Sequence, residues 1–385
     1  MHISSRLPGS LEPNTLTLEL CRLRGCGVEI LDLTVSNPIA AGLGYPDEAL
    51  QRALQSAEVG RYSPDPRGLR RVREAVVQWH GHGLDPDHVL LTASTSEAYA
   101  WLFKLLGDPG DEVLVPSPSY PLFEWLARLE GLRAIQVPAY FHERWNLDLG
   151  ALEAACGERT RVIIAVNPNN PTGQFLSRDE WAGLTQLCQR KGLALLVDEV
   201  FADYSLEPGE ERMATALDDP EPRCPVFVLS GLSKIAALPQ VKLGWILARG
   251  ISAQALLEPL AFIADQYLSV SAGAQAAAPA LLQGAPEVQS RIRQRLRQNL
   301  SILDQALAAH PHLSRGSVEG GWTVLLRRPA VDSDEACALR ILRAAGVLVH
   351  PGHFFDLPGD GYLVLSLLTA SARFREGLAR LLPYL

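Results

Sequence analysis

The chain has 385 residues, of which 47% are hydrophobic and 20% charged, and its formal net charge is −8. This length exceeds what one hydrophobic core usually serves, so we expect two subdomains. The acidic balance argues against nucleic-acid binding, and no stretch of about 18 apolar residues lacks charges and turn signals, which argues against a membrane span. The six cysteines contain no C-x-x-C pair, and the N-terminus does not resemble a signal peptide, so a cytoplasmic enzyme or binding protein is expected.

From about residue 60 to residue 250, short apolar runs alternate with longer helical patterns. Strands are predicted at residues 113–115, 162–166, 193–197 and 226–229. Because these runs are apolar without alternation, each strand should be buried on both faces, as in a parallel α/β sheet. Helices are predicted at residues 68–80, 95–106, 120–129 and 177–191. The pattern therefore predicts an α/β fold with a mainly parallel sheet sandwiched by helices.

A long helical pattern at residues 272–309 has few breakers and should link two subdomains. Beyond it, apolar runs at residues 322–326 and 362–366 alternate with helical patterns at residues 334–345 and 370–382. These elements predict a smaller α+β domain. We therefore expect a large domain at residues 41–275, a small domain at residues 276–385, and an N-terminal segment, residues 1–40, that joins the small domain.

Lys234 is the candidate nucleophile. The chain contains only four lysines, and Lys104 and Lys191 have ordinary explanations on helix surfaces. Lys234 instead ends the segment Leu-Ser-Gly-Leu-Ser-Lys at residues 229–234, just past a buried apolar run. A lysine in such small, apolar company is desolvated, which should lower its pKa and favour the neutral amine that forms Schiff bases.

Polar groups follow three of the predicted strands. Residues 167–173 read Asn-Pro-Asn-Asn-Pro-Thr-Gly, Asp198 and Glu199 follow the next strand, and Lys234 follows the third. Ligands bind beyond the carboxyl ends of such strands, so an amide, a carboxylate and an amine should meet at one sheet edge. Residues 91–98 join an apolar run to a helix and leave N–H groups free for an anion. Each piece alone also fits a turn or a helix cap, but the four in this order indicate one site.

This arrangement resembles the fold-type-I enzymes that use pyridoxal 5′-phosphate (PLP), specifically the class I/II aminotransferase family. The resemblance runs from Leu33 to the C-terminus, and the segment at residues 167–173 is its most specific motif. Residues 198–200 and 233–234 follow at the family's usual separations, and residues 320–322 and 351–352 resemble its small-domain landmarks. The resemblance implies a homodimer that moves an amino group from an amino acid or amine to a 2-oxo acid by a ping-pong mechanism.

The resemblance also implies a role for each matching residue. Lys234 would form a Schiff base with PLP and then move a proton from the substrate Cα to the cofactor. Asp198 would keep the pyridine nitrogen protonated, and Asn170 would donate a hydrogen bond to the phenolic oxygen. Tyr120 would stack on the ring, and Tyr62 would reach the phosphate of the neighbouring subunit. The other implied contacts are Ser94, Thr95, Ser96, Ser233 and Lys242 with the phosphate, and Ser36, Asn170 and His353 with the substrate.

Three positions depart from the family pattern. Phe201 stands where a tyrosine is usual, and without that phenol the Schiff base should keep its proton to higher pH. Lys242 replaces a phosphate-binding arginine and keeps the charge without the bidentate fork. Val364 replaces the arginine that clamps a substrate α-carboxylate. We therefore expect carboxylate recognition to be absent, or relocated to Lys242, His350, His353 or an arginine of the N-terminal segment.

Two other functions stay open. A PLP-dependent lyase, racemase or decarboxylase of the same fold would also fit a site without the arginine. A PLP-binding regulatory module is the third interpretation, although no basic helix-turn-helix pattern precedes Leu33. His80, His82 and His88 could suggest a metal, but a polar helix end is the simpler interpretation, so no metal is expected.

Overall fold

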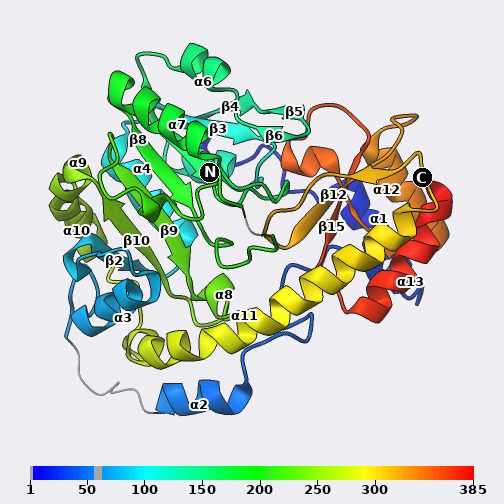
Figure 1. Cartoon of the computed structure of the whole chain (residues 1–385), viewed down its shortest axis with the longest axis horizontal. Helices are drawn as coiled ribbons and strands as arrows, with labels where there is room; N and C mark the ends of the chain where they lie inside the picture. The colour runs from blue at the N-terminus through cyan, green and yellow to red at the C-terminus, as the bar shows by residue number, and fades with distance from the viewer. Residues whose placement is uncertain (1–2, 56–62, 208) are drawn as a thin grey trace.

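The structure is a computed structural model that describes residues 3–55, 63–207 and 209–385. Its main element is a seven-stranded sheet with the order β2-β10-β9-β8-β7-β3-β4 (Figure 1). Strand β10 is antiparallel to β2 and β9, whereas the other neighbouring pairs are parallel. The strands are β2 (Val89–Thr92), β3 (Glu112–Ser117), β4 (Arg133–Pro138), β7 (Thr160–Val166), β8 (Ala194–Asp198), β9 (Val226–Gly231) and β10 (Gly244–Arg249).

The strands of this sheet alternate their side chains between two cores. On β8, Leu195 and Val197 face one core, whereas Ala194 and Leu196 face the other. The first core packs against α3 (Arg70–His80), α7 (Arg178–Lys191) and α11 (Ala272–Leu307), and the second packs against α4 (Thr95–Leu106), α5 (Phe123–Leu129) and α10 (Leu257–Asp265). The prediction of a mainly parallel sheet sandwiched by helices is therefore confirmed.

Helix α11 has 36 residues and runs from the large sheet to the C-terminal part of the chain (Figure 1). The Ser271 side chain caps its first turn by accepting a hydrogen bond from the Ala274 N–H group. One end of the helix contacts α2 (Asp47–Gln55), α3 and α8 (Leu232–Ile235), and the other end contacts α13 (Ser371–Leu381). The helix thus runs between the large sheet and the C-terminal part of the chain.

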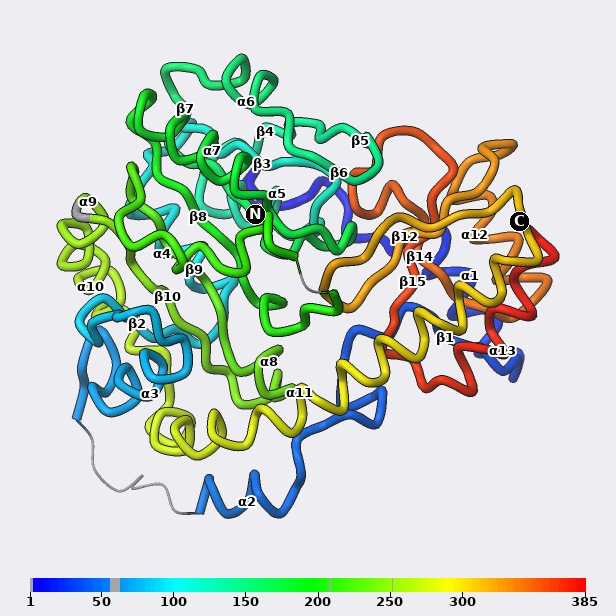
Figure 2. Tube along the Cα trace, in the orientation of Figure 1, coloured from blue at the N-terminus to red at the C-terminus, as the bar shows by residue number. Residues whose placement is uncertain are grey.

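The C-terminal part forms an antiparallel sheet with the order β11-β12-β15-β14, whose strands are Ser314–Arg315, Thr323–Arg327, Tyr362–Ser366 and His350–Pro351. Residues 15–32 of the N-terminal segment lie against this part (Figure 2), whereas Arg6 bonds to the Leu129 carbonyl oxygen at the end of α5. Helix α1 (Thr15–Gly25) packs on α12 (Asp334–Ala345), and β1 (Leu31–Asp32) pairs in parallel with β13 (Val347–Leu348). The domain boundaries expected at residues 40 and 275 stay predictions.

Some elements differ from the predicted ones. The helix expected at residues 120–129 begins at Phe123, because the chain turns at Pro121 and Leu122 before it can form the helix. Strands β4 and β10 and the hairpin of β5 (Tyr140–His142) and β6 (Arg144–Asn146) were not predicted.

Among the helices in the described part of the chain, none is both long enough and apolar enough to cross a membrane.

Candidate active site

Two adjoining cavities open at the carboxyl ends of β7, β8 and β9. The first, which we call the lysine cavity, has a volume of about 280 Å³ and is lined by Lys234, Asp198 and the first turn of α4. The second, which we call the histidine cavity, has a volume of about 310 Å³ and is lined by His350 and Val364. The residues that line both cavities are Ser36, Tyr120, Asn170 and Phe201.

Lys234 lies in the short helix α8, which directly follows β9. Its Nζ atom is 5.1 Å from the ring centroid of Trp322 and 5.6 Å from that of Phe201. The Tyr204 hydroxyl donates a hydrogen bond of 2.6 Å to the Lys234 carbonyl oxygen and so anchors the backbone beneath the amine. Burial lowers the pKa of Lys234, and the nearby Asp198 carboxylate opposes part of this shift. The desolvated amine that the sequence predicts is therefore present.

Asp198 ends strand β8, and only 8% of its surface is exposed. Its carboxylate accepts hydrogen bonds from the Tyr99 hydroxyl at 3.1 Å and from the Val200 N–H group at 3.2 Å. Burial raises its pKa to about 6, although both hydrogen bonds and Lys234 act in the opposite direction. A carboxylate whose pKa is raised by burial is stabilised in its charged form by a cationic partner, so Asp198 is suited to bind one.

Sequence analysis did not identify Tyr99 as part of the site. Tyr99 lies one helical turn after Thr95, on the buried face of α4. Its spacing of four residues from the predicted anion-binding turn could have identified it as a neighbour of the site. Trp322 was recognised as a motif residue, but its approach to Lys234 was not foreseen. Both aromatic residues come from segments far from the residues that they contact.

The first turn of α4 forms one end of the lysine cavity. Ser94 caps the helix, and its hydroxyl accepts a hydrogen bond from the Glu97 N–H group at 3.2 Å. The neighbouring Thr95 and Ser96 also line the cavity, together with Ser233 and Lys242. A helix N-terminus with hydroxyl groups and a lysine beside it is suited to a phosphate group.

The Asn-Pro-Asn-Asn-Pro-Thr-Gly segment presents only one of its asparagines to both cavities. Asn167 is buried and bonds to backbone groups of Leu176 and Met213, and Asn169 donates a hydrogen bond to the Pro118 carbonyl oxygen. Asn170 faces the two cavities, where its Oδ1 atom accepts a hydrogen bond from the Thr323 hydroxyl at 3.4 Å. The first two asparagines therefore shape the loop that presents Asn170.

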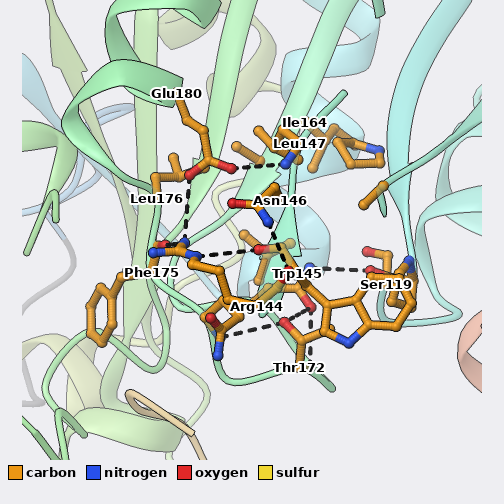
Figure 3. Close-up of a pocket in the computed structure, with 17 residues that line it drawn as sticks. Ser119, Arg144, Trp145, Asn146, Leu147, Ile164, Thr172, Phe175, Leu176 and Glu180 are labelled. Atoms are coloured by element: carbon orange, nitrogen blue, oxygen red, sulfur yellow. Dashed lines mark hydrogen bonds and ion pairs between the residues drawn. The ribbon is translucent and has the colours of Figure 1, made fainter. Parts of the chain in front are cut away.

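The other side of this loop borders a separate cavity of about 40 Å³ (Figure 3). There the Arg144 guanidinium donates to the Phe175 carbonyl oxygen and forms ion pairs with Glu180 and Glu319, at 3.5 and 3.3 Å. Gly173 ends the loop with a φ of +72°, and a Cβ atom there would lie 2.8 Å from the Gly320 carbonyl oxygen. These contacts hold the loop against the C-terminal part of the chain.

Not every predicted site residue lies in the cavities. Tyr120 lines both and is 45% exposed, whereas His353 is exposed and lines neither, so its role in substrate binding stays a prediction. Tyr62 lies outside the described residues. His80, considered for a metal, accepts a hydrogen bond from the Trp245 indole at 3.0 Å, and burial lowers its pKa to about 4.

The charged groups that could bind a carboxylate are few. Among the described residues that line the two cavities, the Lys and Arg side chains are Lys234 and Lys242. In the described N-terminal segment, Arg6 donates to the Leu129 carbonyl oxygen and Arg22 pairs with Glu19, and neither these two nor Arg24 lines either cavity. His350 is the relocation candidate that lines the histidine cavity.

Comparison with known proteins agrees with this geometry. The family profile described as aminotransferase class I and II matches residues 28–375. An alanine aminotransferase of Mycobacterium tuberculosis is 28% identical over 94% of this chain and 86% of its own length. An arginine–pyruvate transaminase of Pseudomonas aeruginosa is 29% identical over 92% of this chain and 90% of its own length. A solved alanine aminotransferase of Pyrococcus furiosus, 26% identical, superposes with a TM-score of 0.88 over 98% of both chains.

The chain belongs to the class I and II aminotransferases, a family of PLP-dependent enzymes. The expectations of a fold-type-I architecture, of an aminotransferase and of PLP as the cofactor are confirmed.

The residues of the lysine cavity fit PLP. The first turn of α4 offers N–H and hydroxyl groups for the phosphate, with Lys242 as a counter-charge. The buried Asp198 carboxylate offers a partner for a protonated pyridine nitrogen, and Lys234 offers an amine for the aldehyde. The three functional groups of the cofactor thus have complementary groups in one cavity.

Proposed function

We propose that this enzyme transfers an amino group from a donor that carries a primary amine to a carbonyl acceptor, with Lys234 as the catalytic base. The observation that carries the proposal is the desolvated Lys234 amine beside the Phe201 and Trp322 rings, in one cavity with the buried Asp198 carboxylate. The relatives named above, which use amino acids and pyruvate, support the same type of exchange.

When bound, PLP supplies an aldehyde that reacts with amines and a pyridinium ring that withdraws electrons from the reacting carbon. Asp198 would hold the proton on the pyridine nitrogen, since its carboxylate is buried and gains from a cationic partner. Asn170, which lines both cavities, would donate to the phenolic oxygen through its amide nitrogen. Thr95 and Ser96 would hold the phosphate at the start of α4.

Lys234 would move the proton between the substrate carbon and the cofactor. Its lowered pKa favours the neutral amine, which is the form that can accept a proton. The hydrogen bond from Tyr204 keeps the Lys234 backbone in place, so the side chain alone provides the movement. The rings of Phe201 and Trp322 shield the amine from water, which favours proton transfer to the substrate carbon over exchange with solvent.

We further propose that the enzyme is a cytoplasmic homodimer in which Tyr62 reaches the neighbouring site. The exposed apolar side chains Phe262, Tyr267 and Leu268 support a subunit contact. Leu268 shares a surface groove with residues 63–66, which immediately follow Tyr62 along the chain.

Reduction with borohydride tests the role of Lys234. In the purified holoenzyme, reduction followed by peptide mapping should place the cofactor on Lys234, and the Lys234→Ala variant should retain none after the same treatment. Addition of a reactive amine should remove the visible absorption band and release one carbonyl product per site. Stable retention of the band with every amine, or cofactor fixed to another lysine, would overturn the proposal.

A further inference from the structure

We propose that the histidine cavity takes a primary amine that bears an aromatic or branched apolar group and no carboxylate on the amine-bearing carbon. The inference rests on the proposed function and narrows its substrate class. It depends on one set of residues, which we call the apolar wall: Trp322, His350, Phe354, Phe355 and Val364.

Val364 lies at the centre of this wall. On β15 it is paired with Leu325 of β12 on one side and with His350 of β14 on the other, and directly paired residues of antiparallel strands share a face of the sheet. Only 2% of its surface is exposed, and it packs in a small apolar cluster with Leu325, Phe355 and Trp145. This position, where the family pattern has a carboxylate-binding arginine, is therefore occupied by hydrocarbon.

No cation in the described residues replaces the missing arginine. The histidine cavity contains neither a lysine nor an arginine among its described lining residues. Lys242 lines the lysine cavity together with the first turn of α4, where it serves the phosphate end. Arg144, on the nearby hairpin, is already engaged by Glu180 and the Phe175 carbonyl oxygen (Figure 3), and it also forms an ion pair with Glu319. A carboxylate without a cation would lose its hydration in this cavity and gain no ion pair.

His350 does not supply the missing charge. Its ring lies 5.7 Å from the Phe354 ring and 5.9 Å from the Phe355 ring, between centroids. This burial lowers its pKa below the usual value, so that the imidazole is neutral near neutral pH. The Asp32 carboxylate acts on the ring and opposes part of this lowering of the pKa, and its negative charge would repel a second carboxylate.

Aromatic rings favour the amine over the amino acid. The rings of Phe201 and Trp322 lie near the Lys234 amine, and their negative faces would repel a substrate carboxylate close to that amine. Ser36 and Asn170 add uncharged polar groups at the junction of the two cavities. A cavity of about 310 Å³ with these walls has room for a ring or a branched alkyl group.

The proposed exchange balances. The donor carbon loses its amino group and one hydrogen and gains a carbonyl oxygen, so it is oxidised by two electrons. The acceptor's carbonyl carbon loses the oxygen, gains the amino group and a hydrogen, and is reduced by two electrons. Because donor and acceptor occupy the same cavity in turn, the acceptor is an aldehyde or ketone without an adjacent carboxylate.

Matched pairs of compounds that differ only in the carboxylate test this inference: 2-phenylethylamine with phenylalanine, and 3-methylbutylamine with leucine. Titration calorimetry on the Lys234→Ala holoprotein would measure binding, and the loss of the visible band in the wild-type holoenzyme would measure reaction. We expect each amine to bind at least about tenfold more tightly than its amino acid and to react at least about tenfold faster.

Two variants of Val364 provide the control. Val364→Arg should reverse the order within each pair, and Val364→Met, of similar length but uncharged, should preserve it. Thermal unfolding would show whether the Val364→Arg variant folds. If it does not fold, the comparison of each amine with its amino acid in the wild-type enzyme tests the inference by itself. Preference for the amino acids in the wild type would overturn the inference and leave the proposed function standing. Failure of every compound to change the band would overturn the proposed function and the inference with it.

Discussion

The lysine cavity and the histidine cavity meet at Asn170 and Phe201 but differ in chemical character. The lysine cavity brings together an amine, a carboxylate, hydroxyl groups and a helix N-terminus. The histidine cavity has the apolar wall around a neutral imidazole, and uncharged hydroxyl and amide groups complete its lining. The first cavity has groups for each part of PLP, and the second has no lysine or arginine among its described lining residues to form an ion pair with an anion.

This difference indicates that the lysine cavity sets the type of reaction and that the histidine cavity sets the preference for substrates. The lysine cavity lies at the ends of strands in the large sheet, where the family pattern is retained at Lys234, Asp198 and Asn170. The apolar wall is formed by His350 and Val364 of the small sheet and by residues next to its strands, and the family pattern is broken at Val364. Variants of the first region should therefore affect all substrates equally, and variants of the second should change the order of substrates.

The largest effect is expected at Asp198. Replacement by asparagine removes the charge that would hold the pyridinium, so kcat/KM should fall by about 10²–10³-fold, similar to the loss of one preorganised electrostatic group. Tyr99→Phe, which removes one hydrogen bond to the same carboxylate, should cost about tenfold at most. Steady-state kinetics on several amines would measure both effects. Unequal losses across the amines would contradict the separation of the two cavities.

Asp198 should also make the stability of the cofactor-free protein depend on pH. The pKa of Asp198 is about 6 in the folded chain and has its usual value of 3.8 in the unfolded chain. Between pH 3.8 and about pH 6, the folded chain therefore keeps the carboxyl proton and the unfolded chain has lost it. Folding is therefore penalised as pH rises through this window, and the full cost is reached above about pH 6. Asp198→Asn removes the cost and should stabilise the cofactor-free protein at pH 7 by roughly 2–3 kcal/mol, but not below about pH 4.

Urea unfolding at several pH values would measure this difference in the free energy of unfolding. The exposed Asp265, changed to asparagine, is the matched control and should show no comparable dependence on pH. An equal gain for Asp198→Asn at every pH would show that packing, rather than the buried charge, is responsible.

A smaller effect is expected where the two cavities meet. Phe201→Tyr would place a phenol near the Lys234 amine, 5.6 Å from the present ring centroid. A hydrogen bond from that phenol to the phenolic oxygen of PLP would stabilise the deprotonated Schiff base, so the spectral titration of the holoenzyme should move to lower pH by about one unit. Phe201→Leu, which adds no donor, should show no such downward shift. A titration unchanged by the tyrosine would contradict the prediction.

The smallest effect is expected at His350. If its imidazole only packs against Phe354 and Phe355, His350→Phe should change kcat/KM for apolar amines by less than about threefold, which is under 1 kcal/mol. His312→Phe, at an exposed position that lines neither cavity, is the control. A loss of tenfold or more at His350 alone would assign it a direct contact with the substrate and weaken the contrast between the cavities.

Sequence analysis predicted the strands and helices whose signals are local. The strands β7, β8 and β9 are short apolar runs, and helix α12 occupies the residues that its pattern indicates. It missed β10, which is antiparallel to its neighbours, and it began α5 three residues early. The direction of a strand and the first residue of a helix depend on how the preceding chain turns. The spacing of apolar residues, every second residue in a strand or every 3.6 residues in a helix, does not show where or how the chain turns.

The sequence by itself determined the chemistry of the lysine cavity, because Asn170, Asp198 and Lys234 each follow a buried strand, and such strand ends meet at one sheet edge. The tertiary structure alone decided which side chains surround that chemistry. The hydroxyl of Tyr99 reaches Asp198 across 99 positions, and the small sheet sets Val364 between His350 and Leu325. Such contacts arise from the packing of whole elements, and local sequence preferences do not determine them.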